Sequence, residues 1–127
     1  MNILIDTHIL LWALYKAEKL SSNTVKLISD ENNLKYISLV SIWEIEIKSS
    51  IGKLEYNSAE VLRDAEAAGF KILDIKKEHI FGLNNLAKIH NDPFDRLLIS
   101  QAEEESFKLI TNDSKIRQYD KSFTIMN

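Results

Sequence analysis

Short apolar runs alternate along the chain with longer segments whose apolar residues recur at a helical period. The runs at residues 3–5, 35–37, 70–75 and 108–111 have the length and composition of buried strands, and residues 123–126 form a candidate edge strand. Strands that alternate with helices pair mainly in parallel, with helices on both faces of the sheet. The pattern therefore predicts a three-layer α/β/α fold around a mainly parallel central sheet.

Capping and stop residues mark the helices between these strands. Asn57 and Glu60 have the spacing of a capping box, Gly52 and Gly69 suit helix ends, and Asp92-Pro93 joins a cap to a proline at the first helical position. The predicted helices lie directly after Thr7, from Ser21 or Ser22 to about Asn32, from Ser38 to Gly52, from Asn57 to Gly69, from about Lys77 to Leu86, from Asp92-Pro93 onward, and as a short turn from Lys115 to Gln118.

The apolar residues of the first three helices predict which sides are buried. They cover most of the helix after Thr7, so that helix is expected to be largely buried or to pack against a partner chain. In the next two helices they lie on one side: Val25, Leu27 and Ile28, then Ile42, Ile45 and Ile51.

Composition narrows the class of protein. A length of 127 residues suits one domain, which we place at residues 1–127, and 45% apolar with 28% charged residues is typical of a compact globular chain. Cysteine is absent, which excludes disulfides, thiolate zinc sites and cysteine nucleophiles. No segment resembles a signal peptide or a membrane span, so we expect a cytoplasmic protein. The net charge of −3 means that any contact with nucleic acid must be local or supplied by a partner or metal.

Four acidic residues lie near the ends of predicted elements: Asp6, Glu44, Asp95 and Asp113. Asp6 and Asp113 follow strands closely, which places both at the carboxyl edge of a parallel sheet, where ligands bind. Asp95 lies in the first turn of its helix, and Glu44 lies inside the helix after the second strand. If the four carboxylates meet, a divalent cation is needed to neutralise them. The pattern then indicates metal-ion chemistry on a phosphate ester.

Each acid alone has an ordinary structural explanation. Asp6 and Asp113 suit helix caps or turns, and Asp95 suits a capping box. Glu44 could form an ion pair with Lys48 one helical turn away. The combination of all four is harder to explain in this way than any single acid.

Four segments of the chain match one known family in its own order. They read ILIDTH at residues 3–8, SLVSIWEI at 38–45, HNDPFDRLLISQA at 90–102 and LITND at 109–113. On these segments the chain resembles PIN-domain proteins, and among them the VapC-type toxins of bacterial toxin–antitoxin pairs. The third segment is the most specific, since short Asp-Thr matches alone are weak.

The resemblance implies a ribonuclease toxin that cleaves RNA internally with magnesium or manganese. Residue by residue, the family's four active-site acids match Asp6, Glu44, Asp95 and Asp113, whereas Asp92 matches a helix cap. We expect Asp6 and Asp95 to be the inner metal ligands. Glu44 and Asp113 would act through water on the metal or at a second metal.

Nearby polar residues have supporting roles in this hypothesis. Thr7 and Thr111 could orient a carboxylate or a bound water, although capping and strand propensity explain them as well. A local basic rim for RNA phosphates could be formed by Lys48, Arg96, Lys115 and Arg117, with solvated surface charge as the alternative.

The histidines and tryptophans are given no place in the site. His8, His79 and His90 have no mutual spacing that suggests a metal site, so we assign them no ligand role. Trp12 and Trp43 are interpreted as core or interface residues, with stacking on nucleic-acid bases as the alternative.

The resemblance also implies partners. It implies self-association, for which the apolar first helices could supply the surface. It further implies an antitoxin that covers the acidic pocket and carries the DNA-binding segment.

Other hypotheses fit the chain less well. A receiver-type phosphoacceptor domain would need paired acids after the first strand and an aspartate ending the third. A haloacid-dehalogenase-type phosphatase would need Asp-x-Asp, but Thr7-His8 follows Asp6. Within the same fold, a nuclease acting on DNA and a domain that only binds RNA remain alternatives.

Overall fold

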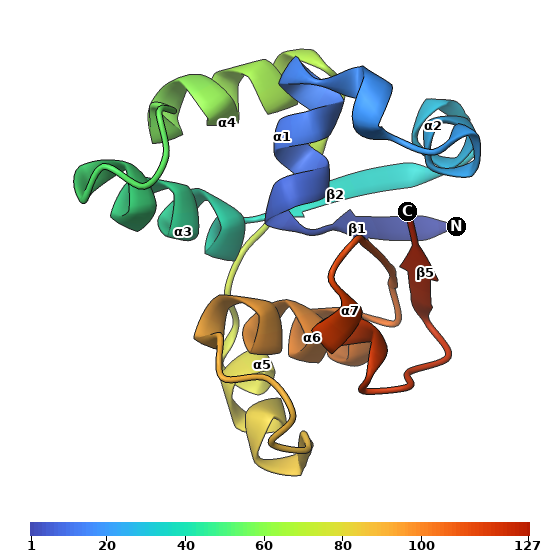
Figure 1. Cartoon of the computed structure of the whole chain (residues 1–127). Coiled ribbons are helices and arrows are strands. Elements are labelled where there is room, and N and C mark those ends of the chain that lie inside the picture. The colour runs from blue at the N-terminus through green and yellow to red at the C-terminus, as the bar shows by residue number, and fades with distance from the viewer.

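The computed structural model describes all 127 residues and places a five-stranded parallel sheet between two layers of helices (Figure 1). The strands are β1 (Asn2–Ile5), β2 (Leu34–Ser38), β3 (Lys71–Leu73), β4 (Lys108–Thr111) and β5 (Thr124–Met126). Their order in the sheet is β3-β2-β1-β4-β5, and every neighbouring pair is parallel. The predicted α/β/α fold is confirmed, including the edge strand at the carboxyl end of the chain.

The helices divide between the two faces of the sheet. They are α1 (Thr7–Tyr15), α2 (Ser22–Ser29), α3 (Leu39–Ser50), α4 (Ser58–Ala67), α5 (Lys77–Phe81), α6 (Pro93–Glu105) and α7 (Ser114–Arg117), with 3-10 turns at Ala17–Lys19 and Gly82–Asn85. In Figure 1, α1, α2 and α4 cover one face and α5, α6 and α7 the other. Helix α3 follows β2 and contacts α1, α4 and α6, so it bridges the two layers beyond the sheet.

The strand order reverses beside β1. From β1 the chain moves outward through β2 to β3, then crosses to the opposite side of β1 for β4 and β5. Because parallel crossovers are right-handed, this reversal sends the earlier and later helices to opposite faces. Connections therefore leave the carboxyl ends of β1 and β4 in opposite directions, and a crevice at such a point is the usual ligand site of an open parallel sheet.

Alternating side chains of the central strands fill two hydrophobic cores. Ile3 and Ile5 of β1 pack with residues of α1 and α4 on one face, whereas Leu4 packs with residues of α6 on the other. All three side chains are fully buried. Burial on both faces explains why the strands read as continuous apolar runs in the sequence.

The capping predictions agree with the structure at several helix ends. Ser21, rather than Ser22, caps α2 by accepting the Thr24 N–H. Gly52 and Gly69 have φ angles of 78° and 91°, a left-handed conformation that favours glycine. Asp92 caps α6 by accepting the N–H groups of the first helical turn.

Some boundaries and buried sides differ from the predictions. Strand β3 stops at Leu73, and the helix predicted at residues 77–86 changes to a 3-10 turn from Gly82. Val25 is 43% exposed because the buried position of α2 belongs to Thr24, whose hydroxyl pairs with that of Ser21. Ile51 is 61% exposed because α3 has already ended before it.

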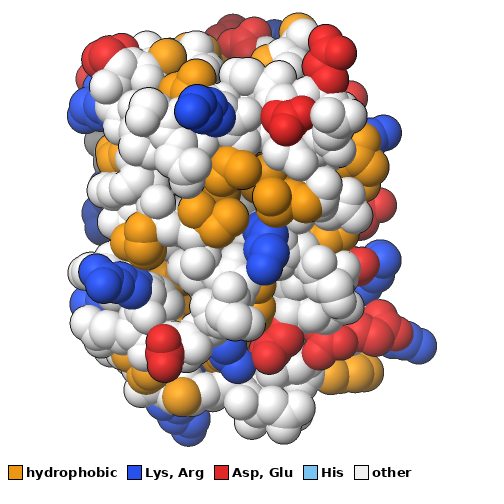
Figure 2. All heavy atoms as spheres, turned by 90° about the vertical axis from the view of Figure 1, so that its right-hand side faces the viewer, with side chains coloured by type: hydrophobic (Ala, Val, Ile, Leu, Met, Phe, Trp, Pro, Cys, Tyr) orange, Lys and Arg blue, Asp and Glu red, His pale blue; other side chains and the backbone are white.

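Figure 2 views the molecule from the side on which Figure 1 draws the amino end of β1. Figure 2 shows hydrophobic side chains gathered at its centre, with charges of both signs around them. No single-sign field covers this face, in agreement with the small net charge. Across the whole chain, no helix combines the length and the apolarity that a membrane span requires.

Candidate active site

The four predicted acids are held at the carboxyl edge of the sheet by the helices that begin there. Asp6 caps α1 immediately after β1, and Asp113 caps α7 two residues after β4. Asp95 lies in the first turn of α6, and Glu44 lies in the middle of α3. Asp6 and Glu44 are each only 3% exposed. Asp6 and Asp113 are therefore helix caps and, at the same time, lie at the edge of the sheet where the site was predicted.

Electrostatic coupling shows that these carboxylates converge. Burial raises the pKa of Asp95 to about 8, and neighbouring negative charges add to this effect. Those charges, largest first, belong to Asp92, Asp6, Glu44 and Asp113. Burial also raises the pKa of Asp6, to which Asp113 adds. The four acids therefore lie near enough to interact electrostatically, with the cap Asp92 beside them.

Thr111 connects Asp6 to the Asp113 loop. Its hydroxyl donates a hydrogen bond to Oδ2 of Asp6 and accepts the backbone N–H of Asp113 at 3.0 Å. The other Asp6 oxygen, Oδ1, accepts the Ile9 N–H at 2.9 Å. Both oxygens of Asp6 are thus fixed in place, and each keeps a further lone pair for another ligand.

Glu44 is fixed from two sides. The Thr7 hydroxyl donates to Oε1 of Glu44 at 2.6 Å and lies 2.9 Å from the Ser41 hydroxyl oxygen. Lys48 forms an ion pair with Oε2. Although partial burial opposes the effect, the hydrogen bond to Glu44 raises the pKa of Lys48, so the ammonium stays charged. The Glu44–Lys48 pair expected one turn apart is therefore present within the site.

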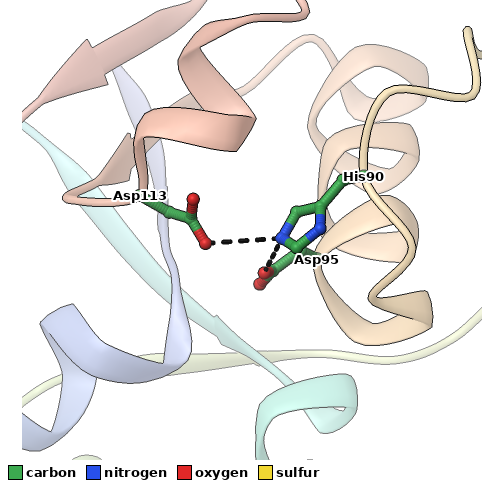
Figure 3. Close-up of side chains that lie close together, drawn as sticks. All are labelled: His90, Asp95 and Asp113. Atoms are coloured by element: carbon green, nitrogen blue, oxygen red, sulfur yellow. Dashed lines mark hydrogen bonds and ion pairs between the residues drawn. The ribbon is translucent and has the colours of Figure 1, made fainter.

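His90 is a residue of the site that the sequence did not indicate. Its side chain lies between Asp95 and Asp113 (Figure 3), with Nε2 2.8 Å from Oδ2 of Asp95 and 3.4 Å from Oδ2 of Asp113. His90 was expected to have no ligand role, and these contacts nevertheless place its ring among the candidate site residues. The only signal in the sequence was its place two residues before the α6 cap, on a loop that could fold back over the first helical turn.

The hydrogen bonds of His90 indicate its tautomer. The Asp92 N–H donates to Nδ1 at 3.3 Å, which requires an unprotonated Nδ1. The ring proton then sits on Nε2 and is donated to Asp95. Burial disfavours the ionised form of Asp95, and the hydrogen bond from Nε2 of His90 partly offsets this effect. Although burial opposes it, the Lys115 N–H and His90 lower the pKa of Asp113.

A cavity of about 260 Å³ opens beside the acids. It is lined by Asp6, His8, Trp12, Asn112 and Asp113. Trp12 is half-buried and Trp43 is 51% exposed, so neither is enclosed in the core. Stacking on bases was only the alternative interpretation of Trp12 in the sequence, and His8 had no assigned ligand role, because their position beside the acids depends on how α1 is rotated about its axis.

The predicted basic rim is only partly available. Arg96 donates to the carbonyl oxygen of Ala87 at 2.8 Å and to the Tyr119 hydroxyl at 3.0 Å, so its guanidinium braces the loop before α6. Lys48 is paired with Glu44, as described above. Lys115 and Arg117 are exposed on α7 and form no ion pair.

The donor set fits a hard divalent cation. Carboxylate oxygens are the ligands that magnesium and manganese prefer. Burial, with the neighbouring negative charges adding to it, raises the pKa of Asp95 to about 8, and a bound cation would favour its ionised form. His90, Asp95 and Asp113 also offer ligand atoms within 4.8 Å of one another. The side chains that meet this distance are therefore Asp95 and Asp113 with His90, and a role for Asp6 and Glu44 in holding the cation stays a prediction.

A family model for the PIN domain matches residues 3–122. The chain belongs to the PIN-domain family. No curated protein matches it by sequence.

Solved structures share this fold at low sequence identity. VapBC2 from Rickettsia felis, bound to a promoter DNA fragment, contains a chain with 20% identity and a TM-score of 0.72, with 100% of this PIN domain and 98% of that chain covered. VapBC-1 from nontypeable Haemophilus influenzae contains a chain with 18% identity and a TM-score of 0.69, and the match covers 100% of this PIN domain and 97% of that chain. A toxin–antitoxin complex from Klebsiella pneumoniae contains a chain with 18% identity and a TM-score of 0.65, and the match covers 97% of this PIN domain and 95% of that chain.

In the metal-free protein, ionisation of Asp95 destabilises the fold. Its pKa rises from 3.8 to about 8 on folding, so the proton stabilises the folded state at low pH and this contribution is lost as the pH rises from about 4 to 8. We expect Asp95→Asn to raise the Tm in EDTA by about 5 °C at pH 8, and by less toward pH 4. Thermal unfolding across this pH range measures the trend. An equal gain at both ends, or the same trend in exposed Asp74→Asn, would contradict this explanation.

Thr111→Val should weaken manganese binding by about tenfold, because it removes the hydroxyl that holds Asp6 while keeping the side-chain shape. Thr111→Ser is the matched control, since it restores the hydroxyl. Calorimetric titration with Mn²⁺ gives both affinities. If the valine variant binds as tightly as the parent, the Thr111 hydroxyl has no part in holding the cation ligands.

His90→Ala should also weaken manganese binding, by roughly 10-fold, since Asp95 loses its hydrogen-bond donor. His90→Gln should recover part of the loss because its amide can donate in place of Nε2. A ligand role for the imidazole predicts a different result. In that case the Mn²⁺ electron paramagnetic resonance spectrum would lose its nitrogen coupling in both variants, and glutamine would not rescue affinity.

Proposed function

We propose that this PIN domain is a magnesium- or manganese-dependent endoribonuclease and the toxin of a toxin–antitoxin pair. The observation that carries the proposal is the convergence of Asp6, Glu44, Asp95 and Asp113 beside the crevice between β1 and β4. Membership of the PIN-domain family supports nuclease chemistry. The likeness in fold to chains of toxin–antitoxin complexes supports the biological role.

The residues divide the work according to how each is held. Asp6 and Asp95 are the proposed inner ligands. Glu44 and Asp113, oriented by Lys48 and by the Lys115 N–H, accept hydrogen bonds from water at the site. When bound, the cation supplies Lewis-acid polarisation of a phosphoryl oxygen and eases ionisation of the attacking water.

Substrate phosphates would be met by the exposed charges of α7. Lys115 and Arg117 follow Asp113 directly and are free of ion pairs, so they can contact RNA phosphates next to the acids. Lys48 neutralises Glu44 and sits too close to it to act as an independent phosphate contact. Of the four predicted phosphate contacts, only Lys115 and Arg117 are therefore free of other partners.

The receiver hypothesis finds no support in the sheet order. It needs an aspartate at the end of the third strand to face Asp6. Here β2 lies between β3 and β1, and Asp74 follows β3 on the outer edge of the sheet. A nuclease acting on DNA would use the same four acids and cation as a ribonuclease. Only the preferred substrate, RNA or DNA, distinguishes these two enzymes.

The proposed partners have different requirements. Ile9 and Leu10 of α1 are fully buried in their own chain, whereas Tyr15 of α1 and Val25 of α2 are 40% and 43% exposed and remain available for the self-association expected of the first helices. Ile80 and Phe81 of α5 are 51% and 62% exposed and are available for self-association. An antitoxin that inhibits the enzyme would present a basic side chain to the acids and supply the DNA-binding segment.

Metal-dependent RNA cleavage tests the activity. We expect single-stranded RNA to be cut with Mn²⁺ or Mg²⁺ present, and Asp6→Asn and Asp95→Asn to lower the rate by at least about 100-fold, because the cation loses its inner ligands. Asp92→Asn is the matched control: asparagine caps a helix as well as aspartate, so most of the activity should remain. Cleavage that persists in the Asp6 and Asp95 variants would refute the site, and faster cutting of the DNA of the same sequence would refute the RNA assignment.

A further inference from the structure

We propose that the cavity next to the acids binds one unstacked nucleobase of the substrate, with the base lying against the indole ring of Trp12. This inference rests on the proposed ribonuclease function, since it assigns a subsite for that enzyme's substrate. The sugar and phosphate of the bound nucleotide would then lie toward Asp6 and Asp113.

The position and size of the cavity suit a single base. Asp6 and Asp113 form one side of it, so whatever fills it lies next to the groups proposed to act on the phosphate. Its volume of about 260 Å³ is below the range of about 300–1,000 Å³ that holds drug-sized ligands. A small flat group therefore fits better than a folded or extended one.

Two rings from one helix side form the opposite side of the cavity. His8 and Trp12 lie one turn apart on α1, with ring centroids separated by 6.3 Å and planes inclined by 53°. Trp12 packs partly against the core and is otherwise open to the cavity. A ring held in this way is a rigid stacking platform, the device by which proteins bind single-stranded bases. The Lys19 ammonium lies over the Trp12 ring at 5.4 Å from its centroid, so a base that stacks on that face must displace it.

The remaining polar groups of the lining suit a base edge. The Asn112 side chain is exposed and makes no hydrogen bond within the protein, so its donor and acceptor are both free. The lining holds two carboxylates and neither a lysine nor an arginine. A phosphate inside the cavity would be repelled and can approach Asp6 and Asp113 only when a cation neutralises them, whereas an uncharged planar ring with donor and acceptor edges needs no cation.

Trp43 does not offer an equivalent platform. Its ring meets Phe94 edge-on, at a centroid separation of 5.0 Å and an angle of 78°, and it does not line the cavity. The chain contains only these two tryptophans. Their fluorescence can therefore be separated by one substitution each.

Single-tryptophan variants test the subsite directly. Trp43→Phe leaves Trp12 as the only emitter, and Trp12→Phe leaves Trp43. Each is titrated with AMP, GMP, CMP and UMP, using excitation at the red edge of the indole band, and with ribose 5-phosphate, which lacks a base. We expect saturable quenching in Trp43→Phe by at least one nucleotide, little by ribose 5-phosphate, and no saturable change in Trp12→Phe. Absent quenching of Trp12, or equal quenching by ribose 5-phosphate, overturns the proposal.

Cleavage kinetics supply a second readout. Trp12→Leu keeps apolar packing against the core without the ring, and should raise KM for RNA by about tenfold while leaving Mn²⁺ affinity unchanged. Trp43→Leu is the matched control and should leave KM near that of the parent. An unchanged KM in Trp12→Leu contradicts the subsite even if the parent cleaves RNA. Nucleotide quenching of Trp12 in a protein that fails to cleave RNA would support the subsite and reject the ribonuclease assignment instead.

Discussion

Parallel pairing of β1 with β4 is the interaction on which the site depends. The register sets Ile5 opposite Ile110, and the Asp6 N–H continues the ladder by donating to the Ile110 carbonyl oxygen at 3.1 Å. That register brings the Thr111 hydroxyl to the Asp6 carboxylate, although the two residues are 105 positions apart. A slip of one residue would turn Thr111 to the opposite face of the sheet and leave Asp6 without this donor.

The same pairing brings several carboxylates close together, and without a cation their burial and mutual repulsion are only partly compensated by nearby donors. Helix N-termini supply N–H groups to Asp6 and Asp113, and Lys48 supplies a full charge to Glu44, but Asp95 receives only the neutral His90 donor. Burial and the neighbouring negative charges accordingly raise its pKa to about 8. Strain of this kind persists where function needs it and is offset by packing elsewhere, here by the fully buried central strand β1.

Local patterns in the sequence predicted most of the fold and most of the site. Buried strands, the Asp92-Pro93 start of α6 and the glycine stops are short-range signals, and they place Asp6, Asp95 and Asp113 at element boundaries. What failed depends on three-dimensional context. His90 reaches the acids through the path of a loop, and the burial of Thr24 in place of Val25 depends on how α2 is rotated. Neither the path nor the rotation is encoded by spacing along the chain.

The apparent choice between a structural and a chemical explanation for each acid was a false one. A helix-capping carboxylate uses part of its hydrogen-bonding capacity on backbone N–H groups, which fixes its orientation and leaves further lone pairs for a ligand. At the carboxyl edge of a parallel sheet, such caps from two helices necessarily approach one another when their strands are neighbours. Asp92 shows the limit of this rule. It caps α6 with the same chemistry, yet its oxygen accepts the N–H groups of Phe94 and Asp95, so it positions Asp95 and raises the pKa of that carboxyl without being one of the four acids.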